Sequence, residues 1–194
     1  MIQQSKYHVT KEEMDKEHDI VEQAKIDPSK FSILYNKYYA QIFRFLYQRV
    51  NDKETAFDFT SQVFLKAMVN LPKYKYRGVP FSSWLYRIAH NEINLVFRKK
   101  IVARTVNIET EHLNSIIEEI EEDENGLEKY QGILIEVIAD LPAAELEIIE
   151  MRFFEKRPFK EIAEILEITE NNAKVKVYRL LDKLRKRITT GKRK

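Results

Sequence analysis

The chain contains no cysteine, only four glycines and five prolines. The lack of cysteine excludes disulfide frameworks, cysteine-ligated zinc sites and cysteine nucleophiles. Because no segment approaches the roughly 18 uninterrupted apolar residues of a membrane span, insertion into a membrane is not expected. The first 20 residues also lack an apolar core after a basic start, so no signal peptide is predicted and a cytoplasmic protein is expected.

The scarcity of glycine and proline also limits the number of turns, whereas long stretches show the apolar spacing of helices. The 194 residues are 44% hydrophobic and 33% charged, which is typical of a globular chain and not of a disordered one. We therefore predict an all-α fold of one or two domains. Without a glycine-rich loop, phosphate cradles of the Walker or dinucleotide type are excluded, and no cofactor or metal is expected.

The net charge of +2 conceals a strong segregation of charge. Residues 27–104 hold 14 basic and 5 acidic side chains, whereas residues 105–131 hold 1 basic and 9 acidic ones. From Asn171 onward, ten lysines and arginines accompany a single aspartate. Two basic blocks flanking an acidic segment favour a polyanionic partner, most often nucleic acid. Solvated helix faces would account for the same charges, so charge alone leaves both interpretations open.

The acidic segment SIIEEIEEDENG also predicts the domain organisation. We find no sustained apolar face in it and interpret it as a linker. The expected order is an N-terminal extension (1–26), a helical domain (27–104), the acidic linker (105–126) and a second helical domain (127–194). The extension is compatible with a short amphipathic helix and shows no motif.

Three amphipathic helices are expected in the N-terminal domain, the third of them beginning near Pro80. This third helix carries a polar stripe, because four of its side chains recur at i, i+4, i+7 and i+11 and share one face. The stripe, with the histidine beside it, consists of Arg87, His90, Asn91, Asn94 and Arg98. Tyr86 and Ile93 are expected beside it, turned away from the core.

The loop before this helix alternates cations with aromatic rings. Its residues are Lys73, Tyr74, Lys75, Tyr76 and Arg77. Cations bind phosphates and aromatic rings stack on unpaired bases, so the mixture suits single-stranded nucleic acid. Packing inside the protein is the alternative for each ring taken alone, whereas the cluster as a whole favours binding.

The C-terminal domain shows a helix-turn-helix pattern. A short helix after Pro158 precedes a three-residue turn and a long basic helix, with Thr169 as the expected N-cap and the small Ala163 where the helices cross. The candidate DNA-binding residues here are Thr169, Asn171, Asn172, Lys174, Val175, Lys176 and Arg179. Asparagine, arginine and an outward valine suit adenine, guanine and the thymine methyl group, while the flanking lysines would hold phosphates. A solvated face is the alternative.

Both domains resemble parts of one protein family. The strings FSILYNKYYAQIFRFLYQRV, AFDFTSQVFLKAM and FSSWLYRIAHNEINLVFRKK resemble, in this order, region 2 of bacterial sigma factors of the extracytoplasmic-function group. The string LPAAELEIIEMRFFEKRPFKEIAEILEITENNAKVKVYRLLDKLRKRI resembles sigma region 4. Region 3 of primary sigma factors is missing between them, which is the layout of the extracytoplasmic-function group.

The resemblance implies a promoter-specificity subunit of RNA polymerase. It implies that residues 73–77 and the polar stripe capture the melted −10 strand of promoter DNA, and that the long basic helix reads the −35 element. It implies binding to the β′ clamp and β flap of core RNA polymerase, with Asp58, Ser61 and Gln62 at the clamp contact. An anti-sigma factor is a further implied partner.

Four positions depart from the family pattern. Ser61 and Gln62 stand where the family usually has glutamine and glutamate, which leaves less charge for the clamp contact. Asn94 stands where aspartate is common. Glu167 occupies a turn position where glycine is usual because φ is often positive there, so either Glu167 adopts that conformation at a cost or the turn differs.

Two other functions remain open on the sequence alone. One is a helix-turn-helix regulator that acts on duplex DNA without polymerase. The other is a sigma mimic that binds an anti-sigma factor and no DNA. An enzyme is least favoured, because the four histidines are scattered and no nucleophile or carboxylate pair stands out.

Overall fold

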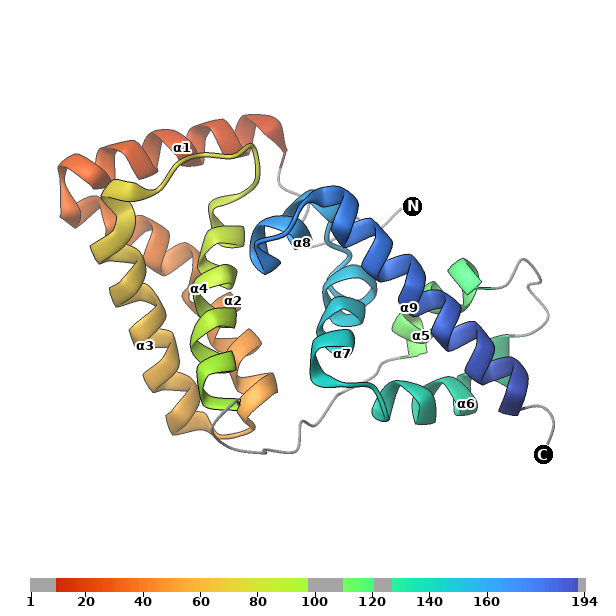
Figure 1. Cartoon of the computed structure of the whole chain (residues 1–194). Helices are drawn as coiled ribbons and strands as arrows, with labels where there is room; N and C mark the ends of the chain where they lie inside the picture. Colours follow the sequence, from red (N-terminus) through yellow and green to blue (C-terminus); the bar gives the residue numbers. More distant parts are fainter. Residues whose placement is uncertain (1–9, 98–109, 121–126, 192–194) are drawn as a thin grey trace. The chain divides into compact units, whose positions relative to one another are not determined.

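The computed structural model describes residues 10–97, 110–120 and 127–191, and all regular elements in these ranges are helical (Figure 1). The chain divides into two compact units, one built mainly from residues 9–105 and the other mainly from residues 106–194. The all-α prediction is confirmed for the described ranges. Within them, no helix combines the length and apolar character needed to cross a membrane.

The N-terminal unit is a bundle of long helices joined by short turns. Its elements are α1 (Lys11–Ile26), η1 (Pro28–Lys30), α2 (Phe31–Val50), α3 (Lys53–Asn70), η2 (Leu71–Lys73) and α4 (Phe81–Phe97). α3 packs against both α2 and α4. The apolar stripes meet in a core in which Leu34, Leu46 and Leu85 are fully buried. Asp52 caps α3 by accepting the N–H of Thr55 at 2.8 Å.

α1 is part of this unit, because it packs against α2, η1 and η2 and buries Val21 and Ala24. Thr10 Oγ1 accepts the N–H of Glu13 at 3.2 Å, and the Glu13 carboxylate accepts the N–H of Thr10 at 2.8 Å. This reciprocal pair is a capping box, which satisfies two backbone groups at the start of the helix. The expected helix of the extension is therefore present as α1, and the capping box fixes where it begins.

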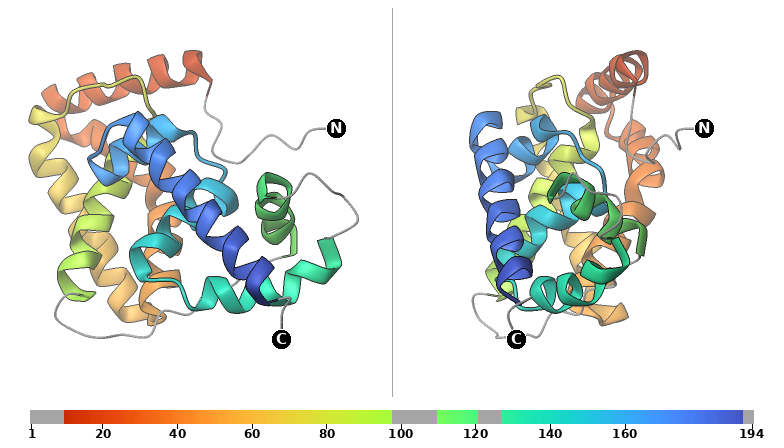
Figure 2. Two further views of the ribbon diagram at one scale, coloured as in Figure 1. Left: turned by 45° about the vertical axis from the view of Figure 1, so that its right-hand side comes forward. Right: turned by 90° about the vertical axis from the view of Figure 1, so that its right-hand side faces the viewer.

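The C-terminal unit is built from shorter helices around one long one. Its elements are α5 (Thr110–Ile120), α6 (Leu127–Ala139), α7 (Ala143–Ile149), the π-type turn η4 (Glu150–Phe154), α8 (Phe159–Leu166) and α9 (Glu170–Gly191). α9 packs against α5, α6 and α7 (Figure 2). Ile149, Ile162 and Leu184 are fully buried in the core of this unit.

α5 lies inside the segment predicted as a linker. Its buried residues, Leu113, Ile116, Ile117 and Ile120, follow helical spacing, so the expected lack of an apolar face is wrong for residues 110–120. Arg185 of α9 donates from Nε and Nη2 to the Ile120 carbonyl at 2.9 and 2.7 Å, which satisfies an acceptor at the end of α5. Residues 121–126 lie outside the described residues, and the predicted domain boundaries remain predictions.

Within residues 10–97, 110–120 and 127–191, three non-glycine residues adopt the left-handed backbone conformation: Asn51 (φ 50°), Lys156 (φ 52°) and Glu167 (φ 54°). Glu167 therefore keeps the turn expected of glycine and bears the steric cost of a Cβ there, which confirms the first of the two alternatives drawn from the sequence. The N–H of Ile168 donates to the Ala163 carbonyl at 3.0 Å and closes the turn.

Lys156→Gly is expected to raise the free energy of unfolding by about 0.5–1 kcal/mol, because glycine removes the Cβ clash and this gain exceeds the added freedom of the unfolded chain. The Lys156 side chain is exposed, so little packing is lost. Urea unfolding measures the change. Asn51→Gly is the control with a smaller expected gain, since asparagine adopts positive φ more readily. An unchanged or lower stability of Lys156→Gly would contradict this account.

Candidate nucleic-acid interface

The polar stripe of α4 lies away from the helix face that is most deeply buried. Leu85 and Ala89 are fully buried, whereas Asn91 is exposed and Asn94 is half-buried. The Asn94 side-chain amide nitrogen lies 2.9 Å from Nε2 of His90, one turn earlier in the helix. Arg87 lies one turn before Asn91, as its spacing predicts. Arg98 lies outside the described residues.

Two residues expected beside this stripe belong to the core instead. Tyr86 is 2% exposed, and its ring lies edge-on to that of Phe45 with the centroids 4.8 Å apart. Ile93 is also 2% exposed. The expectation that they face away from the core is wrong, because α4 packs against both α2 and α3 and therefore buries a wider arc than one apolar stripe.

In the loop before α4, the cationic side chains are exposed, whereas the two aromatic rings are buried or half-buried. Lys73, Lys75 and Arg77 are exposed. The Tyr74 ring is buried, with its centroid 5.2 Å from that of Phe81 and 4.9 Å from that of Trp84, and this burial raises the pKa of its hydroxyl. Tyr74 therefore follows the alternative of packing inside the protein, and its ring is not placed to stack on a base.

Tyr76 is half-buried and contacts α1. Its ring stacks on His18, with the centroids 4.9 Å apart and the planes inclined by 19°. Partial burial raises the pKa of the Tyr76 hydroxyl. Part of the ring remains accessible, so Tyr76 is the loop tyrosine that is available to a base.

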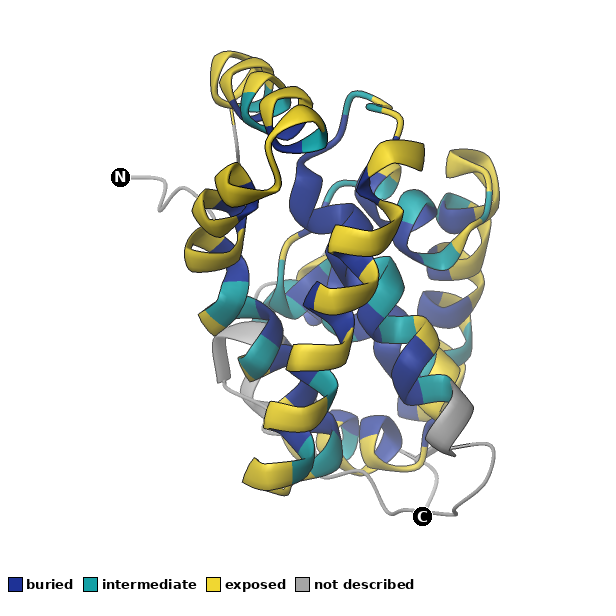
Figure 3. Cartoon of the chain, turned by 90° about the vertical axis from the view of Figure 1, so that its left-hand side faces the viewer, coloured by how far each residue is buried: buried dark blue, intermediate teal, exposed yellow. Residues whose placement is uncertain are grey.

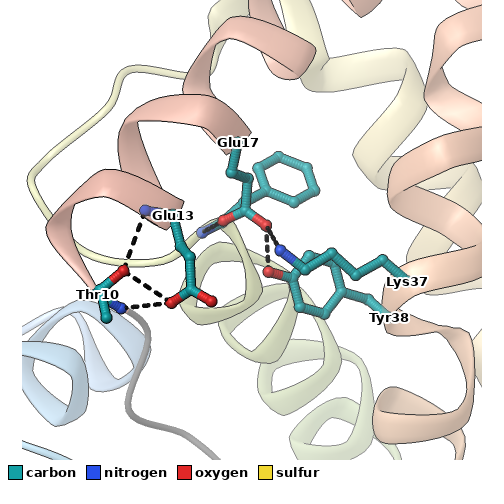
Figure 4. A network of polar contacts seen from close by, with 6 residues as sticks. Thr10, Glu13, Glu17, Lys37 and Tyr38 are labelled. Carbon is teal, nitrogen blue, oxygen red and sulfur yellow. Dashed lines mark hydrogen bonds and ion pairs between the residues drawn. The ribbon is translucent and has the colours of Figure 1, made fainter.

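A buried carboxylate on α1 holds the start of α4, and the sequence analysis did not identify it. Glu17 is 3% exposed, and its Oε2 accepts the backbone N–H of Phe81 at 2.8 Å. Its Oε1 accepts the Tyr38 hydroxyl and the Lys37 ammonium, the latter at 2.8 Å (Figure 4). The only sequence signal for this role was that Glu17 shares a helix face with the apolar residues Val21 and Ala24 of α1.

The long basic helix α9 begins as the sequence predicts. Thr169 Oγ1 accepts the N–H of Asn172 at 3.2 Å, which confirms Thr169 as the N-cap. Ala173 and Val177 are buried on the side of α9 that faces the core. The predicted reading residues Asn171, Asn172, Val175, Lys176 and Arg179 are exposed, as is Thr169. Lys174 is half-buried and forms an ion pair with Glu170 at 2.9 Å.

Tyr178 is an exposed residue of α9 that the sequence analysis missed. Its side chain is 54% exposed, and its ring centroid lies 6.3 Å from that of Phe159 in α8. Its position, three residues after Val175, was the available signal, because that spacing places both on one helix face.

A fully buried arginine organises the turn between η4 and α8. Arg157 donates from Nε to Glu155 at 2.5 Å and from Nη1 to Glu161 at 3.0 Å. Arg152 in turn donates to the Arg157 carbonyl at 3.3 Å. These hydrogen bonds connect η4 to the start of α8, the first helix of the helix-turn-helix. The only sequence signal for this network was the proximity of the charged residues Glu155, Arg157 and Glu161.

The predicted polymerase contact lies on an exposed face of α3. Asp58, Ser61 and Gln62 are all exposed, and the Ser61 hydroxyl donates to the Phe57 carbonyl at 3.0 Å. The same helix exposes three large apolar side chains, Leu65 (58%), Met68 (42%) and Val69 (66%). Figure 3, in which the side of the unit carrying α3 faces the viewer, shows exposed residues along the helices of this surface.

An aromatic row on α2 adjoins this face. Tyr35, Tyr39, Phe43 and Tyr47 recur every four residues, and successive rings lie 5.1, 6.4 and 5.9 Å apart. Phe57 of α3 lies 4.6 Å from Phe43, so the row continues onto α3. Together with Leu65, Met68 and Val69 of α3, these residues are called the α2–α3 apolar face. Exposed apolar side chains gathered on neighbouring helices in this way are typical of protein contacts.

Two family descriptions match the chain. "Sigma-70 region 2" matches residues 34–100, and "Sigma-70, region 4" matches residues 131–184. No group of histidine, aspartate and glutamate that could hold a metal ion occurs in the described ranges.

Curated relatives of the chain are named as sigma factors. The chain is 28% identical over 163 residues to the ECF RNA polymerase sigma factor BldN of Streptomyces coelicolor, covering 83% of this chain and 61% of BldN. It is 23% identical over 152 residues to the ECF RNA polymerase sigma factor SigM of Bacillus subtilis, covering 78% of this chain and 91% of SigM. The chain thus spans less than two thirds of BldN and most of SigM.

A solved structure has a similar fold. CnrH, solved in complex with the cytosolic domain of CnrY, superposes with a TM-score of 0.54 at 19% sequence identity. The superposition covers 87% of this chain and 94% of the other. At this identity the likeness concerns the fold.

Proposed function

This chain belongs to the extracytoplasmic-function sigma factors, and we propose that it directs transcription initiation as the promoter-specificity subunit of RNA polymerase. The observation that carries the proposal is the presence of two units, each with a face suited to a different form of DNA. α9 presents amide and guanidinium groups on an exposed helix, while residues 73–77 present three exposed cations before α4.

The two faces divide promoter recognition between them. An exposed helix capped at its start fits the major groove, where Asn171, Asn172 and Arg179 reach base edges of the −35 element and Lys174 and Lys176 bind phosphates. The loop and the α4 stripe bind the melted −10 strand, because cations, amides and an accessible ring suit unpaired nucleotides. The amide of Asn94 adds no negative charge beside this strand.

Core polymerase binds the α2–α3 apolar face, with Asp58, Ser61 and Gln62 at its polar edge. The exposed apolar groups of α3 compensate for the charge that Ser61 and Gln62 lack relative to the family pattern. A regulator acting without polymerase would leave this face without a partner. The proposal also places the protein in the cytoplasm, with an anti-sigma factor as a further partner and no catalytic role of its own.

Leu65→Ala is expected to weaken binding to core RNA polymerase about fivefold or more, because burying a leucine side chain contributes roughly 1.5–3 kcal/mol and alanine retains only a small part of this. Fluorescence anisotropy of the labelled protein titrated with core polymerase measures the dissociation constant. Ile26→Ala is a matched control, since Ile26 is an apolar residue 88% exposed at the end of α1 and outside the α2–α3 apolar face. Equal affinities of the two variants would argue against this contact.

In vitro transcription tests the proposed function directly. The purified protein is added to core RNA polymerase with a pool of genomic fragments, and start sites are mapped by sequencing the transcripts. New start sites that share −35 and −10 sequences are expected. Transcription no greater than that of core polymerase alone would refute the proposal.

A further inference from the structure

We propose that α1 is a positioning element for −10 strand capture and that Glu17 is its central residue. This inference rests on the proposed function and adds the means by which the loop and α4 are held ready for the strand. Glu17, His18 and Lys25 fasten the segment from Tyr74 to Phe81 to α1 at three points.

The first point is the start of α4. The first N–H groups of a helix have no partner within it, and Pro80 directly precedes this helix. Glu17 supplies the acceptor from another helix, because its Oε2 accepts the Phe81 N–H at 2.8 Å. A carboxylate is favoured here by the positive end of the helix dipole. Since Oε1 is bound by Tyr38 and Lys37, both oxygens of Glu17 are satisfied although the side chain is buried.

The second and third points lie within the loop. Lys25 Nζ donates to the Tyr74 carbonyl at 3.0 Å, and His18 stacks on Tyr76. Tyr74 and Tyr76 thus contact the protein, while the residues that alternate with them are exposed. Tyr74, which follows η2, has an extended backbone (φ −62°, ψ 134°), and in such a segment successive side chains point to opposite sides. Contacts that hold the two tyrosines against α1 therefore leave Lys75 and Arg77 exposed on the other side. The contacts with α1 therefore leave the loop cations free to meet the DNA backbone, while the half-buried ring of Tyr76 keeps one part accessible to a base.

Glu17→Gln tests this role. Glutamine keeps the shape of the side chain but removes its charge, and its amide group places a donor against the Phe81 N–H or against the donors of Lys37 and Tyr38. We expect discrimination between the native −10 sequence and single-base substitutions to fall roughly tenfold, the effect of losing a hydrogen bond to a charged group. The measurement is open-complex formation by holoenzyme on a promoter fragment selected by the wild-type protein.

The preference ratio at the −10 element distinguishes a positioning role of Glu17 from a role in stability alone. A variant that only folds less well lowers the amount of active holoenzyme and leaves the preference ratio at −10 unchanged. Affinity for core polymerase and preference at −35 are expected to stay at wild-type values. Glu12→Gln is the matched control, because the same change is made on α1 at an exposed glutamate paired only with Lys16 among the described residues.

Amide hydrogen exchange at Phe81 tests the hydrogen bond from the Phe81 N–H to Glu17 directly. Faster exchange in Glu17→Gln is expected, and unchanged exchange would overturn the capping contact. Faster exchange with an unchanged −10 ratio would overturn the positioning role. If Glu17→Gln does not fold, Lys25→Met is tested instead, because the Lys25 side chain is partly exposed and its loss is tolerated more easily. An unchanged preference ratio at the −10 element in Lys25→Met would equally overturn the proposal. Failure of the wild-type holoenzyme to open any promoter would instead refute the proposed function.

Discussion

Holoenzyme containing Arg179→Ala is expected to lose preference at one base pair of the −35 element by roughly 5- to 150-fold, the range of one good bidentate base contact. Arg179 is exposed on α9, whereas Val177 and Leu180 of the same helix are buried. An exposed guanidinium on a recognition helix has the donor geometry that guanine requires. The measurement is binding of holoenzyme to a library of −35 substitutions at several salt concentrations.

Lys176→Ala is the matched control for this prediction. Lys176 is equally exposed on α9, but an ammonium that binds phosphate does not read sequence. Its loss is expected to lower affinity for all sequences and to reduce the salt slope by about one unit, while Arg179→Ala leaves the slope nearly unchanged. If both variants lowered affinity equally for all −35 sequences, α9 would not read sequence as proposed. No effect in either would favour a sigma mimic.

Replacing Tyr76 and Arg77 together by alanine is expected to slow promoter opening by roughly 5- to 150-fold, the range for loss of stacking on one base. Arg77 is exposed and Tyr76 is half-buried, so both remain accessible to a melted strand. Permanganate reactivity of unpaired thymines reports opening.

Duplex binding through the −35 element is the internal control, because α9 lies in the other unit and is expected to be unaffected. Tyr74→Phe is a second control, since it keeps the buried ring against Phe81 and Trp84 and is expected to preserve opening. Normal opening by the Tyr76 and Arg77 double variant would contradict strand capture by this loop.

Local patterns were sufficient to predict much of the fold. The apolar spacing in the N-terminal domain and the helix-turn-helix pattern both depend on neighbours within one or two turns, so α2, α3, α4 and α9 could be predicted. Thr169 as an N-cap is equally local, because a cap bonds a backbone group three residues ahead. The exposed face of α9 followed from the same periodicity.

α5 has the same local signal as the other helices, set among many acidic side chains. Its four apolar residues occupy helical positions, but the surrounding glutamates led to the interpretation as a linker. Burial of those residues in the C-terminal unit, and the bonds from Arg185 to the Ile120 carbonyl, compensate for ordering a segment of this charge. A partner helix distant in sequence thus decides whether such a segment folds.

By itself the sequence determined the helical class, the two blocks that match sigma regions, and the faces on which the candidate DNA-binding residues lie. Only the tertiary structure decided which aromatic residues are free to act, since burial of Tyr74 and Tyr86 depends on rings brought from other elements. The same holds for Glu17, whose partners lie 20 to 64 residues away in the chain. Periodicity defines one side of a helix, but the number of neighbours packed around it determines how wide an arc is buried. That number is a property of the assembled bundle and of no single segment.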